Sequence, residues 1–385
     1  MKVGSRRAFI AAATAAVTCI LIEIGAAAQA PPQAAADKVP LSDEVFKSIQ
    51  LLKGIPVDTF FESMGMFASA MGNDCTFCHV KEAYYDKTQF AQVTPKMQRA
   101  RQMITMMNEL NEKYFAGRTR VTCFTCHGGS NAPKSEPDLA LQYGEAVEDP
   151  NARDFPVDTR VTGEQVLDKY VQVLGGADRL SRLTSFTARG MYWGFDTAQE
   201  KVPFELFAKA PNQQTMVVHL ATGNSTRTFD GRNGWYAGPD QPVPLLTLTE
   251  GNLDRARLEA IVAFPTGLKT AFPRWRTGRT AIDGKEVRIV QGMGAAQALA
   301  NFYFDEAGLL VRMVRWTRTP VGFIPTQVDY SDYRDVAGAG IKMPFKRTVS
   351  QTYMQMTVEL SDVQPNATIQ ANRFAQPAPV NPVTK

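Results

Sequence analysis

The sequence predicts a multidomain chain: a mainly α-helical module over residues 41–133, then an α+β domain built on an antiparallel sheet over residues 161–378. Three observations indicate this division. Apolar residues recur at helical spacing in the first segment, whereas strand-like runs separated by hairpin turns dominate the second. Residues 134–160 between them are rich in Asp, Pro, Asn and Ala, so we expect a linker there.

Residues 1–30 have the pattern of a signal peptide. A basic region precedes an apolar run at residues 8–22, and small residues follow at 26–30. Glu23 ends the apolar run, which argues against a retained membrane span. We therefore expect export to a bacterial periplasm. A lipid anchor at Cys19 stays open as an alternative, as does peripheral association with a membrane.

Charge and composition narrow the classes of partner. The chain has 385 residues, 44% of them hydrophobic and 21% charged, which is typical of globular domains. Removing residues 1–30 takes away three basic groups and one acidic group, so the formal net charge falls from +4 to +2. No long basic run remains, and nucleic acid is not expected as a partner.

Three helices are expected in the first segment. One covers residues 42–52, where apolar residues at helical spacing follow a polar N-cap. A second lies between Pro56 and Gly72. A third begins at Pro95, with Thr94 as its N-cap, and runs to about residue 115.

A five-residue pattern occurs twice, once after the second helix and once after the third. The copies are Cys75-Thr76-Phe77-Cys78-His79 and Cys123-Phe124-Thr125-Cys126-His127. Cys-x-x-Cys-His is the attachment site of a c-type haem: the two thiols form thioethers, and the histidine coordinates the iron. We therefore expect two haem c groups, with these six residues binding the cofactor: Cys75, Cys78, His79, Cys123, Cys126 and His127.

The remaining cysteine and histidine sharpen this interpretation. The chain contains five cysteines and three histidines, and only Cys19 and His219 lie outside the two motifs. His219 alternates within an expected strand and is interpreted as a core or surface residue. Three other interpretations of the cysteine pairs stay open: a four-cysteine zinc site, a thioredoxin-like redox motif, and structural disulfides.

A methionine on each preceding helix is a candidate sixth ligand of the iron. Met64 lies eleven residues before Cys75, and Met103 lies twenty before Cys123. A thioether ligand closes the iron to exogenous ligands and raises its reduction potential. The alternative is that these methionines fill the core, as methionines on apolar helix faces commonly do.

At these residues the sequence resembles the cytochrome subunit of purple-bacterial photosynthetic reaction centres. One stretch runs from Phe61-Glu62-Ser63-Met64-Gly65-Met66 into the first motif. The other combines Arg101-Gln102-Met103-Ile104-Thr105-Met106 and Asn111 with Val121-Thr122, the second motif and Gly128-Gly129.

The resemblance covers about residues 41–133 and implies repeated helix–turn–CxxCH units. It implies Met64 and Met103 as distal ligands, with Met66 and Met71 competing for the first role. That family's subunit carries four haems, whereas this chain has motifs for two. A role beside a photosynthetic reaction centre is therefore not expected, but a shared dihaem unit is.

The second segment is expected to begin with an amphipathic helix at residues 163–174 and to continue as strands. One further helix is expected at 253–263, and turn signals stand at 230–234 and 305–308. The expected strands cover residues 185–193, 202–208, 214–220, 286–291, 300–304, 309–317, 326–333 and 347–360.

The strand pattern and the Gly-Leu-Leu-Val-Arg hairpin loosely resemble the half-barrel periplasmic lipoprotein carriers of the LolA type. This resemblance implies a sheet that can hold an apolar ligand or lipid, and equally a packed structural domain. No nucleophile elbow, phosphate loop or dinucleotide signature is present.

The function expected from the sequence is electron transfer by a periplasmic dihaem c-type cytochrome, with both irons ligated by His and Met and with redox proteins as partners. No catalytic residue is assigned, so an electron-transfer protein is preferred to an enzyme. Two alternatives remain. One is a dihaem peroxidase or small-molecule reductase with one open haem, and the other is a redox-sensing or lipid-binding carrier that uses the C-terminal domain.

Overall fold

The computed structural model describes residues 38–144, 149–294 and 299–381. The expected signal peptide therefore lies outside the described residues. Val39–Lys385 form one compact unit. Within the described ranges, no helix is long and apolar enough to cross a membrane.

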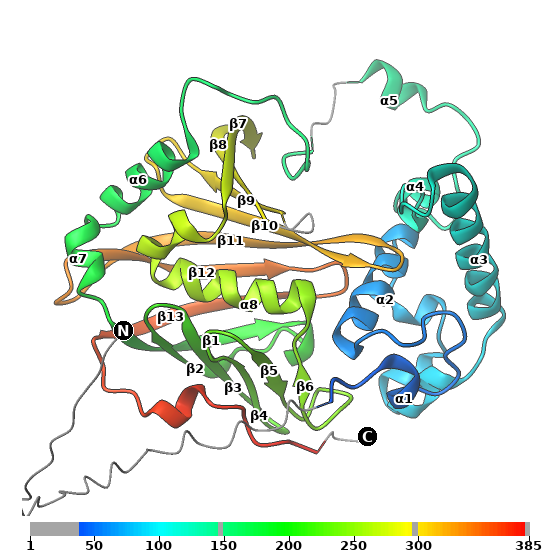
Figure 1. The fold of residues 1–385 in the computed structure, drawn as a ribbon. Coiled ribbons are helices and arrows are strands. Elements are labelled where there is room, and N and C mark those ends of the chain that lie inside the picture. Colours follow the sequence, from blue (N-terminus) through cyan, green and yellow to red (C-terminus); the bar gives the residue numbers. More distant parts are fainter. Residues whose placement is uncertain (1–37, 145–148, 295–298, 382–385) are drawn as a thin grey trace, which may run out of the picture. The chain divides into compact units, whose positions relative to one another are not determined.

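The first part of this unit is built on helices (Figure 1). One boundary of each long helix lies at the residue that the sequence predicts. Helix α2 ends at Gly72, which adopts the left-handed conformation. Helix α3 begins after Thr94, whose hydroxyl accepts a hydrogen bond from the Met97 amide. The helices of residues 41–144 are α1 Ser42–Val45, α2 Val57–Met71, α3 Pro95–Phe115, α4 Cys123–His127 and α5 Leu139–Tyr143.

The prediction of a helix over residues 42–52 is wrong beyond Val45, where the observed helix ends. The helix ends where the backbone of Phe46 becomes extended, and Ser48 further on has a φ of 65°. The Ser42 hydroxyl donates to the Leu52 carbonyl at 2.5 Å, so the chain turns back on itself instead of continuing.

The second part is a single antiparallel sheet of thirteen strands, with strand order β6-β5-β4-β3-β2-β1-β13-β12-β11-β10-β9-β8-β7. This confirms the expected antiparallel-sheet architecture. The strands are β1 Ser185–Gly194, β2 Val202–Lys209, β3 Gln213–Leu220, β4 Gly223–Phe229, β5 Gly234–Ala237, β6 Leu246–Thr247, β7 Arg274–Ile282, β8 Lys285–Met293, β9 Leu299–Phe304, β10 Leu310–Thr319, β11 Gly322–Val336, β12 Ile341–Ser350 and β13 Gln355–Pro365.

The single strand expected over residues 347–360 is two strands. A tight turn separates β12 from β13, and the Gln351 amide donates to the Met354 carbonyl across it at 2.8 Å. The sequence carries no glycine at this turn, so its strand-like composition hid the break. Strands β4, β5, β6 and β7 were not expected either.

Helices α6 (Gly163–Val173), α7 (Ala177–Ser181) and α8 (Glu250–Ala263) accompany the sheet (Figure 1). Apolar residues of α6 and α8 share one large core with the strands, and this core includes Leu167, Tyr170, Leu258 and Phe304. The helices expected at 163–174 and 253–263 are therefore confirmed as elements that cover the sheet.

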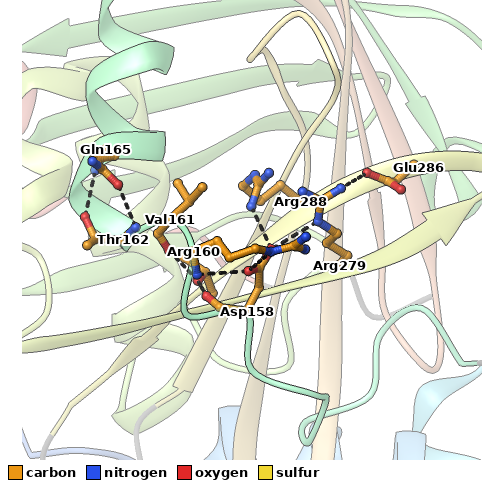
Figure 2. A network of polar contacts seen from close by, with 9 residues as sticks. Asp158, Arg160, Val161, Thr162, Gln165, Arg279, Glu286 and Arg288 are labelled. Carbon is orange, nitrogen blue, oxygen red and sulfur yellow. Dashed lines mark hydrogen bonds and ion pairs between the residues drawn. The ribbon is translucent and has the colours of Figure 1, made fainter.

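Residues 149–161 lie against the β7–β9 edge of the sheet. The Asp158 amide donates to the Thr277 carbonyl at 2.8 Å, and the Asp158 carboxylate accepts hydrogen bonds from Arg160, Arg279 and Arg288 at 2.9–3.3 Å (Figure 2). One carboxylate thus ties this connecting segment to two strands.

Helix α2 packs against the sheet domain through polar groups as well as apolar ones. The carboxylate of Asp58, only 5% exposed, accepts hydrogen bonds from the Thr249 amide and hydroxyl, both at 2.7 Å, and from Asn252. One turn along the helix, Glu62 is fully buried and accepts from Gln351 at 3.3 Å. Both acids face residues that lie about two hundred or more positions away in the sequence.

Candidate haem sites

The first Cys-x-x-Cys-His motif follows directly on the end of α2. Cys75–Phe77 form a single 3₁₀ turn, and Asp74 caps it by accepting from the amide of Thr76 at 2.8 Å and from its hydroxyl at 2.6 Å. Cys75 is exposed, Cys78 is half-buried, and both thiols are free. The cap fixes the turn from which both thiols project.

The imidazole of His79 is oriented by one hydrogen bond. Its Nδ1 lies 3.1 Å from the Phe90 carbonyl, and the Phe90 ring packs edge-on against it at 5.0 Å between ring centroids. Because a carbonyl only accepts, Nδ1 carries the proton and the Nε2 lone pair is left free to coordinate. Burial lowers the pKa of His79, which favours this neutral form.

The second motif forms a short helix, α4, with its own cap. The Thr122 hydroxyl accepts from the Thr125 amide at 3.2 Å, and the Thr122 amide donates back to the Thr125 hydroxyl at 3.0 Å. His127 repeats the arrangement of His79: its Nδ1 lies 3.1 Å from the Ser130 carbonyl. Both histidines therefore present Nε2.

Helix α3 joins the two motifs. At its start, the Thr94 hydroxyl donates to the Cys78 carbonyl at 2.5 Å. Near its end, Asn111 accepts from the amides of Arg120 and Val121 at 2.9 Å and donates to the Val121 carbonyl at 2.7 Å. In the sequence, Asn111 is indicated only by the family resemblance. In the structure it is buried, and its three hydrogen bonds hold the chain that leads into Cys123.

The two motifs also meet through backbone. The Gly129 amide, just after the second motif, donates to the Ala70 carbonyl in the last turn of α2 at 3.0 Å. Asn73 and Asn131 are hydrogen-bonded side chain to side chain beside it. The end of the helix before the first motif is thus joined to the loop after the second.

The candidate distal ligands lie on α2 and α3 and are half-buried: Met64 and Met103. Their competitors are placed differently. Met66 and Met107 are 5% and 4% exposed and belong to an apolar core with Leu52, Phe60, Val321 and Ile324, whereas Met106 is 44% exposed. Met71 is half-buried near the end of α2.

Two of the alternatives for the cysteines, disulfides and a zinc site, find no support in the described residues. All four motif cysteines are free, so they form no disulfide. No three Cys, His, Asp or Glu side chains gather into a metal site in the ranges that the structure describes, so the four thiols do not converge as a zinc site would require. Burial raises the pKa of the Cys123 thiol to about 11 and also raises that of Cys75 and Cys78.

Exposed large apolar side chains are concentrated in the segment that carries the two motifs. Among described residues, eight of the twelve large apolar side chains that are exposed lie in residues 41–133, although this segment is only about a quarter of the chain. The far longer segment 161–378 has one, Phe195. The eight are Leu51, Tyr84, Tyr85, Val93, Met106, Tyr114, Phe115 and Phe124.

Residues 5–140 match the family model of the photosynthetic reaction centre cytochrome C subunit. The resemblance seen at the two motifs is confirmed: over these residues the chain is similar to a family of c-type cytochromes. Among relatives, the chain is 30% identical over 99 residues to the photosynthetic reaction center cytochrome c subunit of Thermochromatium tepidum, covering 25% of this chain and 23% of that one. It is 29% identical over 119 residues to the subunit of Rubrivivax gelatinosus, covering 28% and 31%.

The chain thus spans less than a third of these cytochrome relatives. Solved structures similar to it include a DUF1329 family protein from Desulfovibrio piger, with a TM-score of 0.39 and 10% identity over 55% of this chain and 96% of that one. A LolA superfamily protein from Nitrosomonas europaea has a TM-score of 0.37 and 12% identity over 56% and 98%.

Proposed function

We propose that this chain is a periplasmic dihaem c-type cytochrome that transfers electrons between protein partners. Cys75 and Cys78 bind one haem and Cys123 and Cys126 the other, with His79 and His127 as the proximal ligands. The bound haems supply reversible one-electron chemistry at iron. The chain's own residues attach the cofactors, orient them and set the ligands of each iron.

The observation that carries this proposal is the matched setting of His79 and His127. Each Nδ1 is committed to a backbone carbonyl at 3.1 Å, Phe90 in one site and Ser130 in the other. Haem- and metal-binding histidines are commonly oriented by a hydrogen bond of this kind, which fixes the tautomer and leaves Nε2 for the metal. Two isolated motifs arising by chance would not both be expected to show it.

The distal ligands in this proposal are Met64 and Met103. Met66 and Met107 are almost fully buried in the apolar core, whereas Met64 packs against this core and is only half-buried, so Met66 and Met107 are less free to reach an iron. Two thioether ligands would leave neither iron open to a substrate, which favours electron transfer over the peroxidase or reductase alternative.

The first test is a pyridine haemochrome assay on the purified chain. We expect two covalent haems per polypeptide, and one after Cys75→Ser with Cys78→Ser. One haem or none in the unchanged chain would contradict the proposal. A high-spin component in the oxidised spectrum would instead favour the enzyme with an open haem.

The ligand assignment has its own test. Met103→His should remove about half of the weak far-red band that marks thioether ligation and lower one reduction potential, because imidazole stabilises ferric iron more strongly. Met106→His is the matched control on the same helix. If Met106→His has this effect and Met103→His does not, Met103 is not the ligand.

A second candidate function, that of a carrier of an apolar ligand or lipid, draws on a cavity between the sheet and α8. Its volume is about 60 Å³, and its lining is mostly apolar but includes Glu259 and Arg347. Ligand pockets typically measure roughly 300–1,000 Å³. The carrier function therefore requires the cavity to open, and mass spectrometry of the organic extract from purified protein tests it: co-purifying lipid supports it.

A further inference from the structure

The tip of the β10–β11 hairpin reaches from the sheet domain into the core beside the second motif. Val321 and Ile324 are fully buried there, although they lie in or next to a turn. They share one apolar cluster with Met66 of α2 and Met107 of α3, and the half-buried Cys123 packs against the same cluster. The sheet domain therefore supplies part of the wall on which the second haem-attachment segment rests.

Gly322 lies close to both α2 and the second motif, and its φ is +134°. A methyl group added at this position would lie 2.9 Å from Met66 Cε and 2.9 Å from Thr122 Cγ2. Such distances are too short for carbon atoms, so either the hairpin or its two neighbours would have to move. Glycine is required here both for the backbone conformation and for the contact.

Thr122 matters because it is the N-cap of α4. Its hydroxyl and amide both bond Thr125, and the next residue is Cys123. The hairpin tip is itself stiff: the Thr319 hydroxyl donates to the Gly322 carbonyl at 2.8 Å, and the Val321 amide donates to the Thr319 hydroxyl at 3.3 Å. The hydrogen-bonded tip therefore lies against Thr122, the N-cap residue at which the second motif begins.

We propose that the hairpin tip Thr319–Gly322 is a positioning element of the second haem site. It holds Thr122, and with it α4, against Met66 of α2. The sheet domain then contributes to the environment of the haem at Cys123, Cys126 and His127. This inference rests on the proposed function.

The test compares Gly322→Ala with Gly223→Ala in the full-length, haem-matured chain. Gly223 is a matched control because its φ is +127°, whereas an added methyl would meet only Pro239 Cγ, at 3.9 Å. Backbone strain is thus similar in both variants, and only Gly322→Ala displaces Met66 and Thr122. The readouts are haem content per chain, the far-red band and the two midpoint potentials.

We expect Gly322→Ala to shift one midpoint potential or to lower haem content from two towards one per chain, and Gly223→Ala to match the unchanged protein. If the two variants have the same haem content, band and potentials, the inference is overturned. If Gly322→Ala does not accumulate, Val321→Ala decides, because it removes packing at the tip without backbone strain. An unchanged pair of potentials in Val321→Ala overturns the inference, and a shift in one of them supports it. Absence of covalent haem from the unchanged chain would overturn the proposed function itself, which is a distinct result.

Discussion

At the scale of single residues, the polar caps around the two motifs decide how the proposed haem-binding groups are presented. Asp74 and Thr122 each cap the turn that carries a cysteine pair, and the Phe90 and Ser130 carbonyls orient the histidines. These bonds are local, within eleven residues of the group they hold. The orientation of the histidines and of the cysteine-bearing turns therefore depends mainly on short segments of chain.

Asp158 is the residue for which we predict a pH dependence. Hydrogen bonds from Arg160 and Arg279 hold the pKa of its carboxyl well below the ordinary value of about 3.9. A carboxyl with a depressed folded-state pKa contributes stability above its unfolded-state pKa, and this contribution is lost as the pH falls through the folded-state value.

We therefore expect Asp158→Asn to lower the melting temperature of the sheet domain at pH 7 and to have a smaller effect near pH 2–3. Thermal unfolding followed by tryptophan fluorescence checks this, with Asp178→Asn as an exposed control. A difference between Asp158→Asn and the unchanged chain that is as large at pH 2–3 as at pH 7 would show that the ion pairs are not its source.

At the scale of elements, helix boundaries with local signals agree with the sequence, and others do not. The helix expected from Pro95 to about residue 115 is observed as Pro95–Phe115, because Thr94 and Pro95 encode its start. The helix expected over residues 42–52 stops at Val45, since the hydroxyl of Ser42 bonds the carbonyl of Leu52 instead. That bond closes a loop that periodicity alone does not reveal.

Helix α3 yields a prediction through Asn111. Asn111→Ala removes three hydrogen bonds that hold residues 120–121, and we expect a loss of about 1–3 kcal/mol of unfolding free energy. Denaturant unfolding followed by haem absorbance measures it. Asn108→Ala, an exposed change on the same helix, is the control and should cost less than about 0.5 kcal/mol. Equal effects of the two changes would mean that Asn111 does not hold the second motif.

At the scale of the whole molecule, buried polar groups join the helical segment to the sheet domain. Asp58 accepts from Thr249 at the start of α8, and burial raises the pKa of its carboxyl while these hydrogen bonds oppose the rise. On α8, Arg255 and Glu259 form a buried ion pair, with 2.7 Å between Arg255 Nε and Glu259 Oε1. Removing one partner from a buried hydrogen bond or ion pair leaves the other partner buried and unsatisfied. The free energy lost is then larger than the net contribution of the intact contact.

We predict that Asp58→Ala destabilises the chain by about 2–4 kcal/mol and separates the unfolding of its two parts. All four tryptophans, Trp193, Trp235, Trp275 and Trp316, lie on strands of the sheet, so fluorescence reports the sheet and haem absorbance reports residues 41–133. The two transitions should coincide in the unchanged chain and diverge in Asp58→Ala. Asp178→Ala, at the same first-turn position of α7, should leave them coincident. Coincident transitions in both variants would exclude Asp58 as the connecting residue.

The sequence by itself determined the two Cys-x-x-Cys-His motifs on which the proposed haem attachment rests, the two long helices and the antiparallel character of the second segment. Thioether attachment needs only a five-residue pattern, and caps, prolines and alternation act over a few residues. The tertiary structure alone decided that the β10–β11 hairpin extends to Thr319 and Gly322 and packs beside Cys123. Pro320 and Pro325 give that stretch the composition of a loop, and its apolar residues find their partners, Met66 and Met107, more than two hundred positions away. Burial against distant residues is a property of the folded chain, so no local pattern encodes it.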